Sequence, residues 1–330
     1  MMSKITFDKQ GHDSFLDFIK AWAIICVLIG HTFPSLNKIG YSLWLGNQVP
    51  LFILIQTFHS YKQGAPKIRF NRVLDRVLLP FLLCEVIVFF VSLLKGGDAN
   101  NLISSALLYG GYGPGSFYPW VYFQMAILLP LIYPFITRIP QKWLILLFIF
   151  ICESLEVICS LVNLPDWIYR LLAVRYLFLV YLSLEWIRNG IVFNLKMLIF
   201  SLLSLAAIVY FRYYSINDEP LFFNTAWKTA RWPCYYYVAN LYVWILHWIW
   251  RGLSVMPNAL KWVKVIASST YEIYLVQMSV IFLFNVNYLG RFIEGSRCRL
   301  VVWAIVVWCI SIGVGVLINT VKLKIKSIKQ

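Results

Sequence analysis

Residues 15–31 read FLDFIKAWAIICVLIGH, an apolar run whose only acidic or basic members besides the final histidine are Asp17 and Lys20. Its length is close to the roughly 20 apolar residues that a helix needs to cross the hydrocarbon core of a membrane. Asp17 and Lys20 interrupt its start and no small-residue cleavage site follows, which is not typical of a cleaved signal peptide. The run therefore predicts a membrane-spanning helix near residues 15–33.

The rest of the chain has the same apolar character. Of 330 residues, 61% are hydrophobic and 13% are charged, and the mean hydropathy is +0.73. A soluble fold of this length cannot bury so much apolar surface, because a single core stops growing near this size. The composition excludes an ordinary soluble enzyme, a disordered protein and a disulfide scaffold. Seven cysteines form no C-x-x-C pair and no Cys/His cluster at metal-ligand spacing, so no metal site is expected.

Hydropathy along the chain predicts an all-α integral membrane protein, with a bundle of ten helices around a central polar cavity. The whole chain, residues 1–330, is expected to form one membrane domain, since no repeat or linker divides it. The ten predicted spans lie near residues 15–33, 42–60, 77–95, 117–136, 143–163, 167–187, 194–214, 234–250, 264–289 and 300–320.

The distribution of basic residues predicts the orientation. With a cytoplasmic N-terminus, Lys and Arg are about twice as frequent in the segments expected inside as in those expected outside. Both termini are therefore predicted to be cytoplasmic, with residues 61–76 inside and 215–233 outside. The net charge of +15 needs no nucleic acid partner on this interpretation. The basic tail KLKIKSIK, residues 322–329, is expected to contact anionic lipid headgroups.

Lys20 and His31 are the strongest candidates for chemistry. Eleven helical steps separate them, about three full turns, so they share one face and lie about 16 Å apart along the axis. Asp17 joins the same face. Ionisable groups inside a membrane usually face the bundle interior or a wet cavity. Asp17 and Lys20 could instead anchor the helix at the inner headgroup boundary, and His31 could be a hydrogen-bonded packing residue.

Arg72 and Arg76 start another apolar run, in the sequence RVLDRVLLPF, and their spacing places them on one helix face. As a pair at the cytoplasmic mouth of a cavity, they could bind the phosphates of a donor molecule. The alternative is that they only mark the cytoplasmic side of the membrane.

Two further segments carry polar or flexible residues next to apolar runs. Residues 110–124 read GGYGPGSFYPWVYFQ, whose glycines exclude a regular helix and whose Trp120 suits either an interfacial aromatic belt or an acceptor site. Residues 268–277 read SSTYEIYLVQ, where Glu272, Tyr274 and Gln277 could either join helices or line a cavity.

The order of these segments along the chain resembles the acyltransferase-3 family of bacterial membrane acyltransferases. The resemblance runs through FLDFIKAWAIICVLIGH, with the family's pattern of a basic residue and a histidine separated by ten residues. It continues through NQVPLFILIQTFH, RVLDRVLLPF and SFYPWVYFQMAILLPLIYPF to TYEIYLVQ, and so covers nearly the whole chain. The family often ends the last of these motifs in Tyr-Leu-x-His, where this chain has Gln277.

The resemblance implies an enzyme of the bacterial cytoplasmic membrane, crossing it many times, that O-acylates a polysaccharide or glycolipid of the cell envelope. Acyl-CoA, usually acetyl-CoA, is the expected co-substrate, with no bound cofactor. The resemblance implies that His31 is the general base, supported by Lys20 and Asp17. The remaining expected residues are Arg72 and Arg76 at the acyl-CoA site, and Trp120, Glu272, Tyr274 and Gln277 at the cavity or acceptor site, with Tyr274 and Gln277 as possible donors to the oxyanion.

Two other classes of protein fit the same features. A transporter or flippase for a lipid-linked saccharide or small anion would also carry membrane charges and aromatic loops. The chain lacks the detectable internal repeat that is common in transporters, and it has the Lys20–His31 pattern. A noncatalytic membrane subunit is the third possibility.

Overall fold

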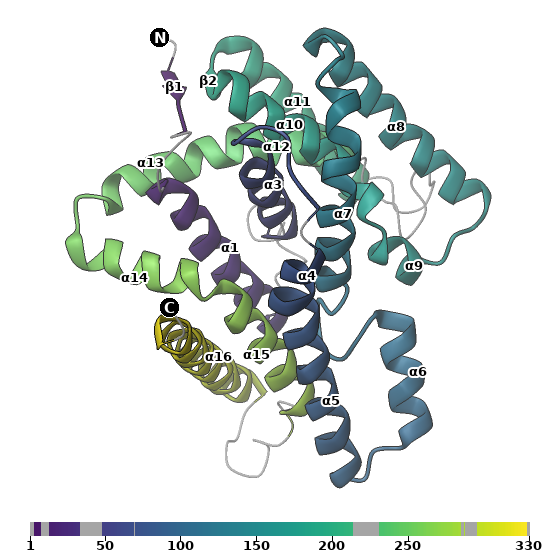
Figure 1. Ribbon diagram of the computed structural model, residues 1–330, viewed down its shortest axis with the longest axis vertical. Helices are drawn as coiled ribbons and strands as arrows, with labels where there is room; N and C mark the ends of the chain where they lie inside the picture. The colour runs from purple at the N-terminus through teal and green to yellow at the C-terminus, as the bar shows by residue number, and fades with distance from the viewer. Residues whose placement is uncertain are drawn as a thin grey trace. The chain divides into compact units, whose positions relative to one another are not determined.

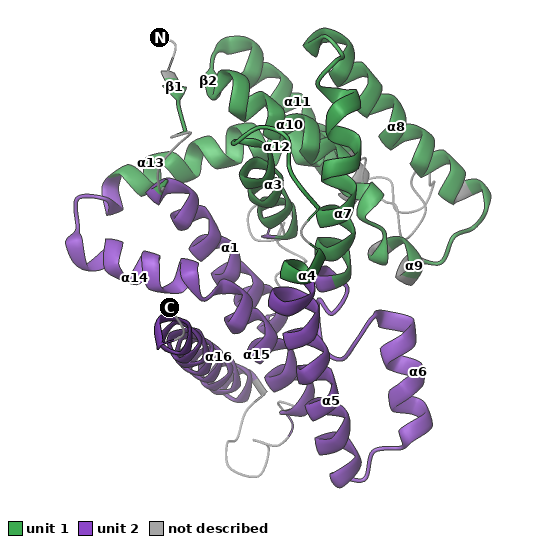
Figure 2. Ribbon diagram, in the orientation of Figure 1, with its two compact units in different colours: residues 1–13, 49–73, 120–251 green, residues 14–48, 74–119, 252–330 purple. Residues whose placement is uncertain are grey.

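The computed structural model describes residues 3–7, 13–33, 48–68, 70–213, 231–284, 287 and 296–328. Helices make up most of these residues. Among them are two strands, β1 (Ser3–Ile5) and β2 (Ile191–Phe193), which pair antiparallel with Ile5 opposite Ile191. The chain forms two compact units, shown in two colours in Figure 2. Unit 1 comprises residues 1–13, 49–73 and 120–251, and unit 2 comprises residues 14–48, 74–119 and 252–330.

Unit 1 is built around α10 (Leu177–Asn189), in which every residue from Phe178 to Leu184 is buried. Hydroxyl groups link its helices through main-chain carbonyls: the Ser183 hydroxyl donates to Leu54 O at 2.9 Å, and the Tyr61 hydroxyl donates to Leu129 O at 2.9 Å. The helices of the unit are α3 (Gln48–Tyr61), α4 (Phe70–Val73), α7 (Tyr118–Ile136), α8 (Gln141–Leu161), α9 (Asp166–Leu171), η3 (Ala173–Tyr176), α10 (Leu177–Asn189), α11 (Leu195–Tyr213), α12 (Arg231–Tyr237), η4 (Val238–Tyr242) and α13 (Val243–Leu253).

Unit 2 is built around α15, which contacts α1, α5 and α16 (Figure 1). The helices of the unit are α1 (Ser14–Thr32), η2 (Leu74–Leu78), α5 (Leu79–Leu94), α6 (Ala99–Tyr109), α14 (Pro257–Ser268), α15 (Thr270–Leu283) and α16 (Ser296–Ile328). The backbones of α15 and α16 approach closely because Gly315 has no side chain: a Cβ there would lie 2.7 Å from the Cα of Ile273. Small residues permit such close packing of membrane helices.

The end of α1 is fixed by a side chain of α16. Trp308 donates its indole N–H to the Thr32 hydroxyl at 3.1 Å, and Thr32 in turn donates to Leu28 O at 2.7 Å. Thr32 is fully buried. The last turn of α1, which carries His31, is therefore held in place on the side of α16.

Among the described residues, four helices are long and apolar enough to cross a membrane: Ser14–Thr32, Phe70–Leu94, Tyr118–Ile136 and Arg297–Ile328. They overlap the spans predicted near 15–33, 77–95, 117–136 and 300–320. A fifth crossing is possible if α14 and α15 together form one broken span. The protein is thus a helical, multi-pass membrane protein by length and composition, and the count of ten spans and the position of both termini stay predictions.

The prediction of one continuous span near 264–289 is wrong in its shape, because α14 and α15 meet at an angle of 67°. The break lies at Ser269, between the end of α14 and the start of α15. The hydroxyls of Ser268 and Ser269 both form hydrogen bonds there. Ser268 donates back to Val265 O at 2.9 Å, and Ser269 accepts from the Asn319 amide at 3.1 Å. A serine that donates to a carbonyl of its own helix, as Ser268 does, competes with the helical hydrogen-bond ladder.

Other predicted spans differ in detail. The region 167–187 is divided into α9, η3 and α10, and the region 234–250 into α12, η4 and α13. Helix α6 was not predicted at all; it begins after Asp98, whose carboxylate accepts the Asn101 N–H at 2.8 Å, and ends at Gly110. Residues 42–47, 214, 285–286 and 288–289 of the predicted spans lie outside the described residues.

The predicted orientation can be tested by labelling single cysteines on a background in which all seven native cysteines are replaced. A membrane-impermeant thiol reagent added to intact cells should modify a cysteine at position 217, in the loop expected outside. It should spare one at position 63, since Gln63 is exposed in the turn after α3 on the side expected to be cytoplasmic. Position 217 itself lies outside the described residues. Labelling of position 63 alone would invert the topology.

Candidate active site

His31 lies in the last turn of α1, and its imidazole contacts the side chain of Gln277 on α15. The Gln277 Nε2 and His31 Nδ1 atoms are 3.0 Å apart. Gln277 is fully buried, with a relative exposure of 0%, whereas His31 is only partly buried. The packing of α15 against α1 brings together two residues that are 246 positions apart in the sequence.

The glycine-rich loop between α6 and α7 passes directly beside this pair. Gly115 has a positive φ of 90°, which only glycine adopts readily. A Cβ on Gly115 would lie 2.9 Å from the Tyr274 hydroxyl oxygen and 3.5 Å from the His31 Cε1. The Tyr274 hydroxyl donates to Gly115 O, so the side chain of α15 that is one turn before Gln277 holds the loop against His31.

Glu85 of α5 holds the other end of the loop. Its Oε2 accepts the Tyr112 N–H at 2.6 Å. Gly111 passes so close that a Cβ there would lie 2.8 Å from the same oxygen. The Glu85 carboxylate, in an otherwise apolar helix, thus fixes the path of the loop. Sequence reasoning gave Glu85 no role; the available signal was its position as the one acidic residue within α5.

Comparison with known proteins identifies the family to which this chain belongs. A family model described as an acyltransferase domain matches residues 13–321, nearly the whole chain. The chain belongs to the acyltransferase-3 family. No curated protein and no solved structure matches the chain. The resemblance inferred from the motifs is thereby confirmed, and the family makes this a membrane acyltransferase.

In this acyltransferase, Lys20 and Asp17 form an ion pair with each other at 3.0 Å. Asp17 is buried, and the Lys20 side chain is 25% exposed. Eleven helical steps separate Lys20 from His31 in α1, about 16 Å along the axis, so the ion pair makes no direct contact with the imidazole. In the structure, His31, Gln277 and Tyr274 lie together in one group, and Lys20 and Asp17 lie outside this group.

Glu272 lies in the first turn of α15, where its carboxylate pairs with Lys322 of α16 at 2.9 Å. This contact joins two helices, one of the two roles considered for the polar residues of this segment. The Tyr274 hydroxyl hydrogen is engaged with Gly115 O, whereas only one of the two amide hydrogens of Gln277 can face the His31 ring. In this arrangement Tyr274 has no hydrogen left to donate to an oxyanion, and Gln277 keeps one N–H.

The remaining predicted site residues lie at helix starts. Arg72 belongs to α4 in unit 1, and Arg76 to the π-helical turn η2 in unit 2; both side chains are exposed. Trp120 is partly buried in the first turn of α7. Exposed guanidinium groups at a helix start suit phosphate binding and equally suit a topological role.

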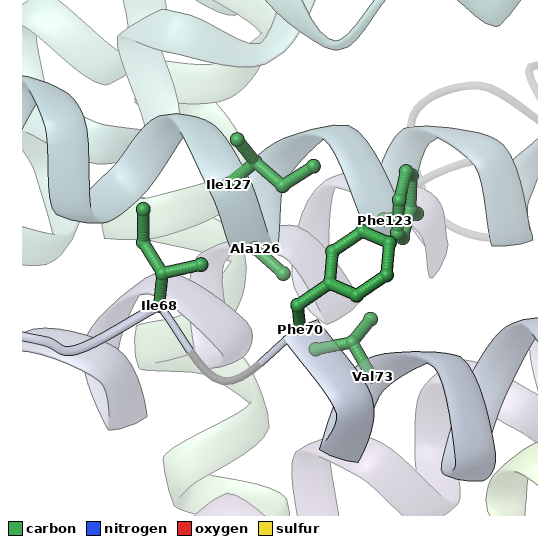
Figure 3. Close-up of a pocket in the computed structure, with 6 residues that line it drawn as sticks. All are labelled: Ile68, Phe70, Val73, Phe123, Ala126 and Ile127. Atoms are coloured by element: carbon green, nitrogen blue, oxygen red, sulfur yellow. The ribbon is translucent and has the colours of Figure 1, made fainter.

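Two hollows in unit 1 are not lined by any of the predicted site residues. The smaller is lined by apolar side chains, and Figure 3 shows Phe70 and Phe123 side by side in its wall, in an edge-to-face contact with ring centroids 5.6 Å apart. The larger has a volume of about 710 Å³ and lies among α8, α10, α11 and α12, with the carboxylates of Glu153 and Glu185 in its wall. Within the part of the chain that is described, no group of three or more His, Cys, Asp or Glu side chains could hold a metal ion.

Proposed function

We propose that this protein transfers an acyl group, most simply acetyl, from acyl-CoA to a hydroxyl of a surface polysaccharide or lipid-linked saccharide at the bacterial cytoplasmic membrane. The observation that carries the proposal is the His31 imidazole, held by Gln277 beside the glycine-rich loop in a chain of the acyltransferase-3 family. An imidazole can take up and release a proton near neutral pH, as acyl transfer to a hydroxyl requires.

In the proposed reaction, His31 accepts the proton of the sugar hydroxyl while the hydroxyl oxygen attacks the thioester carbonyl carbon. The new C–O bond forms, the C–S bond breaks, and the imidazolium returns the proton to the departing thiolate of CoA. A two-step route would use the same residue as a nucleophile, with an acyl-His31 intermediate that the sugar hydroxyl then attacks. Both routes need one ring nitrogen of His31 to be free of other contacts.

Transfer can be tested directly with purified protein in lipid nanodiscs and acetyl-CoA labelled in the acetyl group. Label should appear in an added saccharide acceptor or in lipid-linked saccharide. A transporter or flippase would instead move its substrate into sealed vesicles without covalent change. Comparing the polysaccharide of cells with and without the gene would identify the acceptor. An acetyl signal that is lost at one carbon would show both which hydroxyl is modified and that the transferred group is acetyl.

Arg72 and Arg76 are proposed to bind the phosphates of acyl-CoA at the cytoplasmic face. Replacement of either by Ala should raise the KM for acyl-CoA about ten- to a hundredfold, since charge-assisted hydrogen bonds contribute about 1.5–3 kcal/mol each. The kcat at saturating donor should change much less.

Lysine variants separate the two roles of these arginines. Arg72→Lys and Arg76→Lys keep the positive charge that sets topology, but they lose the two-pronged contact of a guanidinium with phosphate. A KM between those of the wild type and the Ala variants supports phosphate binding. A wild-type KM in all four variants would leave the pair as a topological marker only.

A further inference from the structure

We propose that Gln277 is a positioning residue for His31, and that its amide oxygen selects the tautomer in which the Nε2 of His31 is free to act as the base. This inference rests on the proposed function, since it assigns a partner to the base of that reaction. It concerns a residue at which this chain has glutamine where the family often has histidine.

Gln277 leaves His31 a single usable ring nitrogen. The amide of Gln277 covers Nδ1 at 3.0 Å and is itself fully buried. Gly115 lies beside the neighbouring ring atom Cε1, where the absence of a side chain keeps that edge of the ring open. Nε2 is therefore the nitrogen that remains for the reacting hydroxyl.

The state of Nε2 depends on which end of the amide faces Nδ1. A neutral imidazole carries one hydrogen, on one nitrogen or the other. With the amide NH₂ toward Nδ1, that nitrogen accepts and Nε2 carries the hydrogen, so His31 cannot take a proton there. With the amide oxygen toward Nδ1, the ring donates from Nδ1 and the lone pair of Nε2 is free.

Rotation of the amide by 180° exchanges these two arrangements without moving a carbon atom. In the arrangement with the NH₂ toward Nδ1, the Oε1 of Gln277 is buried and has no hydrogen-bond partner among the described residues. This oxygen is the acceptor that the base-competent arrangement uses. Once His31 has taken the proton, both ring nitrogens are donors, and Oε1 remains the partner of Nδ1. The buried aspartate of a Ser-His-Asp triad orients its histidine by the same logic, with a charge in place of the amide.

Three substitutions test this assignment. Gln277→Leu removes the partner of Nδ1 and should lower kcat at least tenfold with little change in the KM for acyl-CoA, in the range seen when partners that orient a functional histidine are lost. Gln277→Glu keeps the acceptor and adds a negative charge, which favours imidazolium; activity should persist, with the acid limb of the pH–rate profile moved up by about 1–3 pH units. Gln277→His should retain most activity.

Gln56→Leu is the matched control. The Nε2 of Gln56 donates to Tyr122 O at 3.1 Å, and its Oε1 is likewise buried with no partner among the described residues, but Gln56 belongs to unit 1 and His31 to unit 2. This variant should keep the wild-type kcat and pH–rate profile. Elution as a monodisperse peak in detergent shows that each variant is folded, and the Glu and His variants remain informative if the Leu variant is not.

The outcomes separate this inference from the function on which it rests. If the wild type transfers no acyl group, the proposed function is wrong. If the wild type transfers and His31→Ala transfers as fast, acyl transfer stands but His31 is not its base, and the role of Gln277 falls with that assignment. If both behave as proposed while Gln277→Leu keeps the wild-type kcat, or Gln277→Glu leaves the pH–rate profile unmoved, the positioning role of Gln277 is wrong and the function stands.

Discussion

Replacing His31 by Ala should leave a protein that inserts and purifies normally but transfers acyl groups about 10²–10⁴-fold more slowly, the usual loss when a general base is removed. The loss should be larger still if His31 forms a covalent intermediate. The helix should survive the change, because the end of α1 is held at Thr32 by Trp308 and alanine favours helices. The measurement is the turnover of labelled acetyl-CoA by purified wild-type and variant protein at saturating acceptor.

His59→Ala and His247→Ala are the controls for this experiment. His59 is exposed at the end of α3, and His247 is partly buried in α13, so both lie in unit 1 and outside the group formed by His31, Gln277 and Tyr274. Both variants should retain most of the activity. Near-normal turnover in His31→Ala together with loss in His247→Ala would move the site to another part of the molecule, although the family assignment would remain.

Replacing Gly115 by Ala should have the second-largest effect, a loss of about 10²-fold in kcat. The added Cβ would lie 2.9 Å from the Tyr274 hydroxyl oxygen, so either the loop or the tyrosine must shift, and both lie next to His31, whose Cε1 would be 3.5 Å from the new Cβ. Displacement of a catalytic geometry by about 1 Å can cost this much. Turnover and thermal stability should be measured on the same preparation.

Gly96→Ala separates backbone strain from the contact with the site. Gly96 has a φ of 85°, close to the 90° of Gly115, so alanine meets a similar conformational cost at both positions. Apart from its chain neighbours, no atom of the described residues lies within 4 Å of a Cβ on Gly96. Gly96→Ala should therefore lose stability but not specific activity. If the two variants lost specific activity equally, the loss in Gly115→Ala would come from backbone strain and not from its contact with Tyr274 and His31.

Short-range sequence patterns, such as hydropathy and glycine content, were enough to predict the elements that depend on residues close together in the chain. The apolar run ending at His31 forms α1, and the glycines of residues 110–117 keep that segment out of a helix. The bend at Ser269 was not predicted, because hydropathy does not register the hydrogen bonds of serine hydroxyls. Ser268 bonds to the backbone of its own helix, and the partner of Ser269, Asn319, is fifty positions away in α16.

The candidate site was predicted only in part for the same reason. His31 was identified from its spacing to Lys20, yet Lys20 pairs with Asp17 and stays three turns away. The contact between His31 and Gln277 and the anchoring of the loop by Tyr274 and Glu85 join distant segments, and no local period encodes them. Ionisable residues within the predicted spans indicated which side chains need partners, but the sequence did not show which residues those partners are.

The distance of 246 positions between His31 and Gln277 has a consequence for the order of synthesis. A ribosome adding about 5–20 residues per second delivers the histidine to the membrane roughly 10–50 s before its glutamine exists. Every nascent chain released before residue 277 carries an imidazole without its partner. Under the proposed function, prematurely terminated copies would therefore occupy membrane without the residue that positions the base, and full activity would appear only once the last sixth of the chain is made.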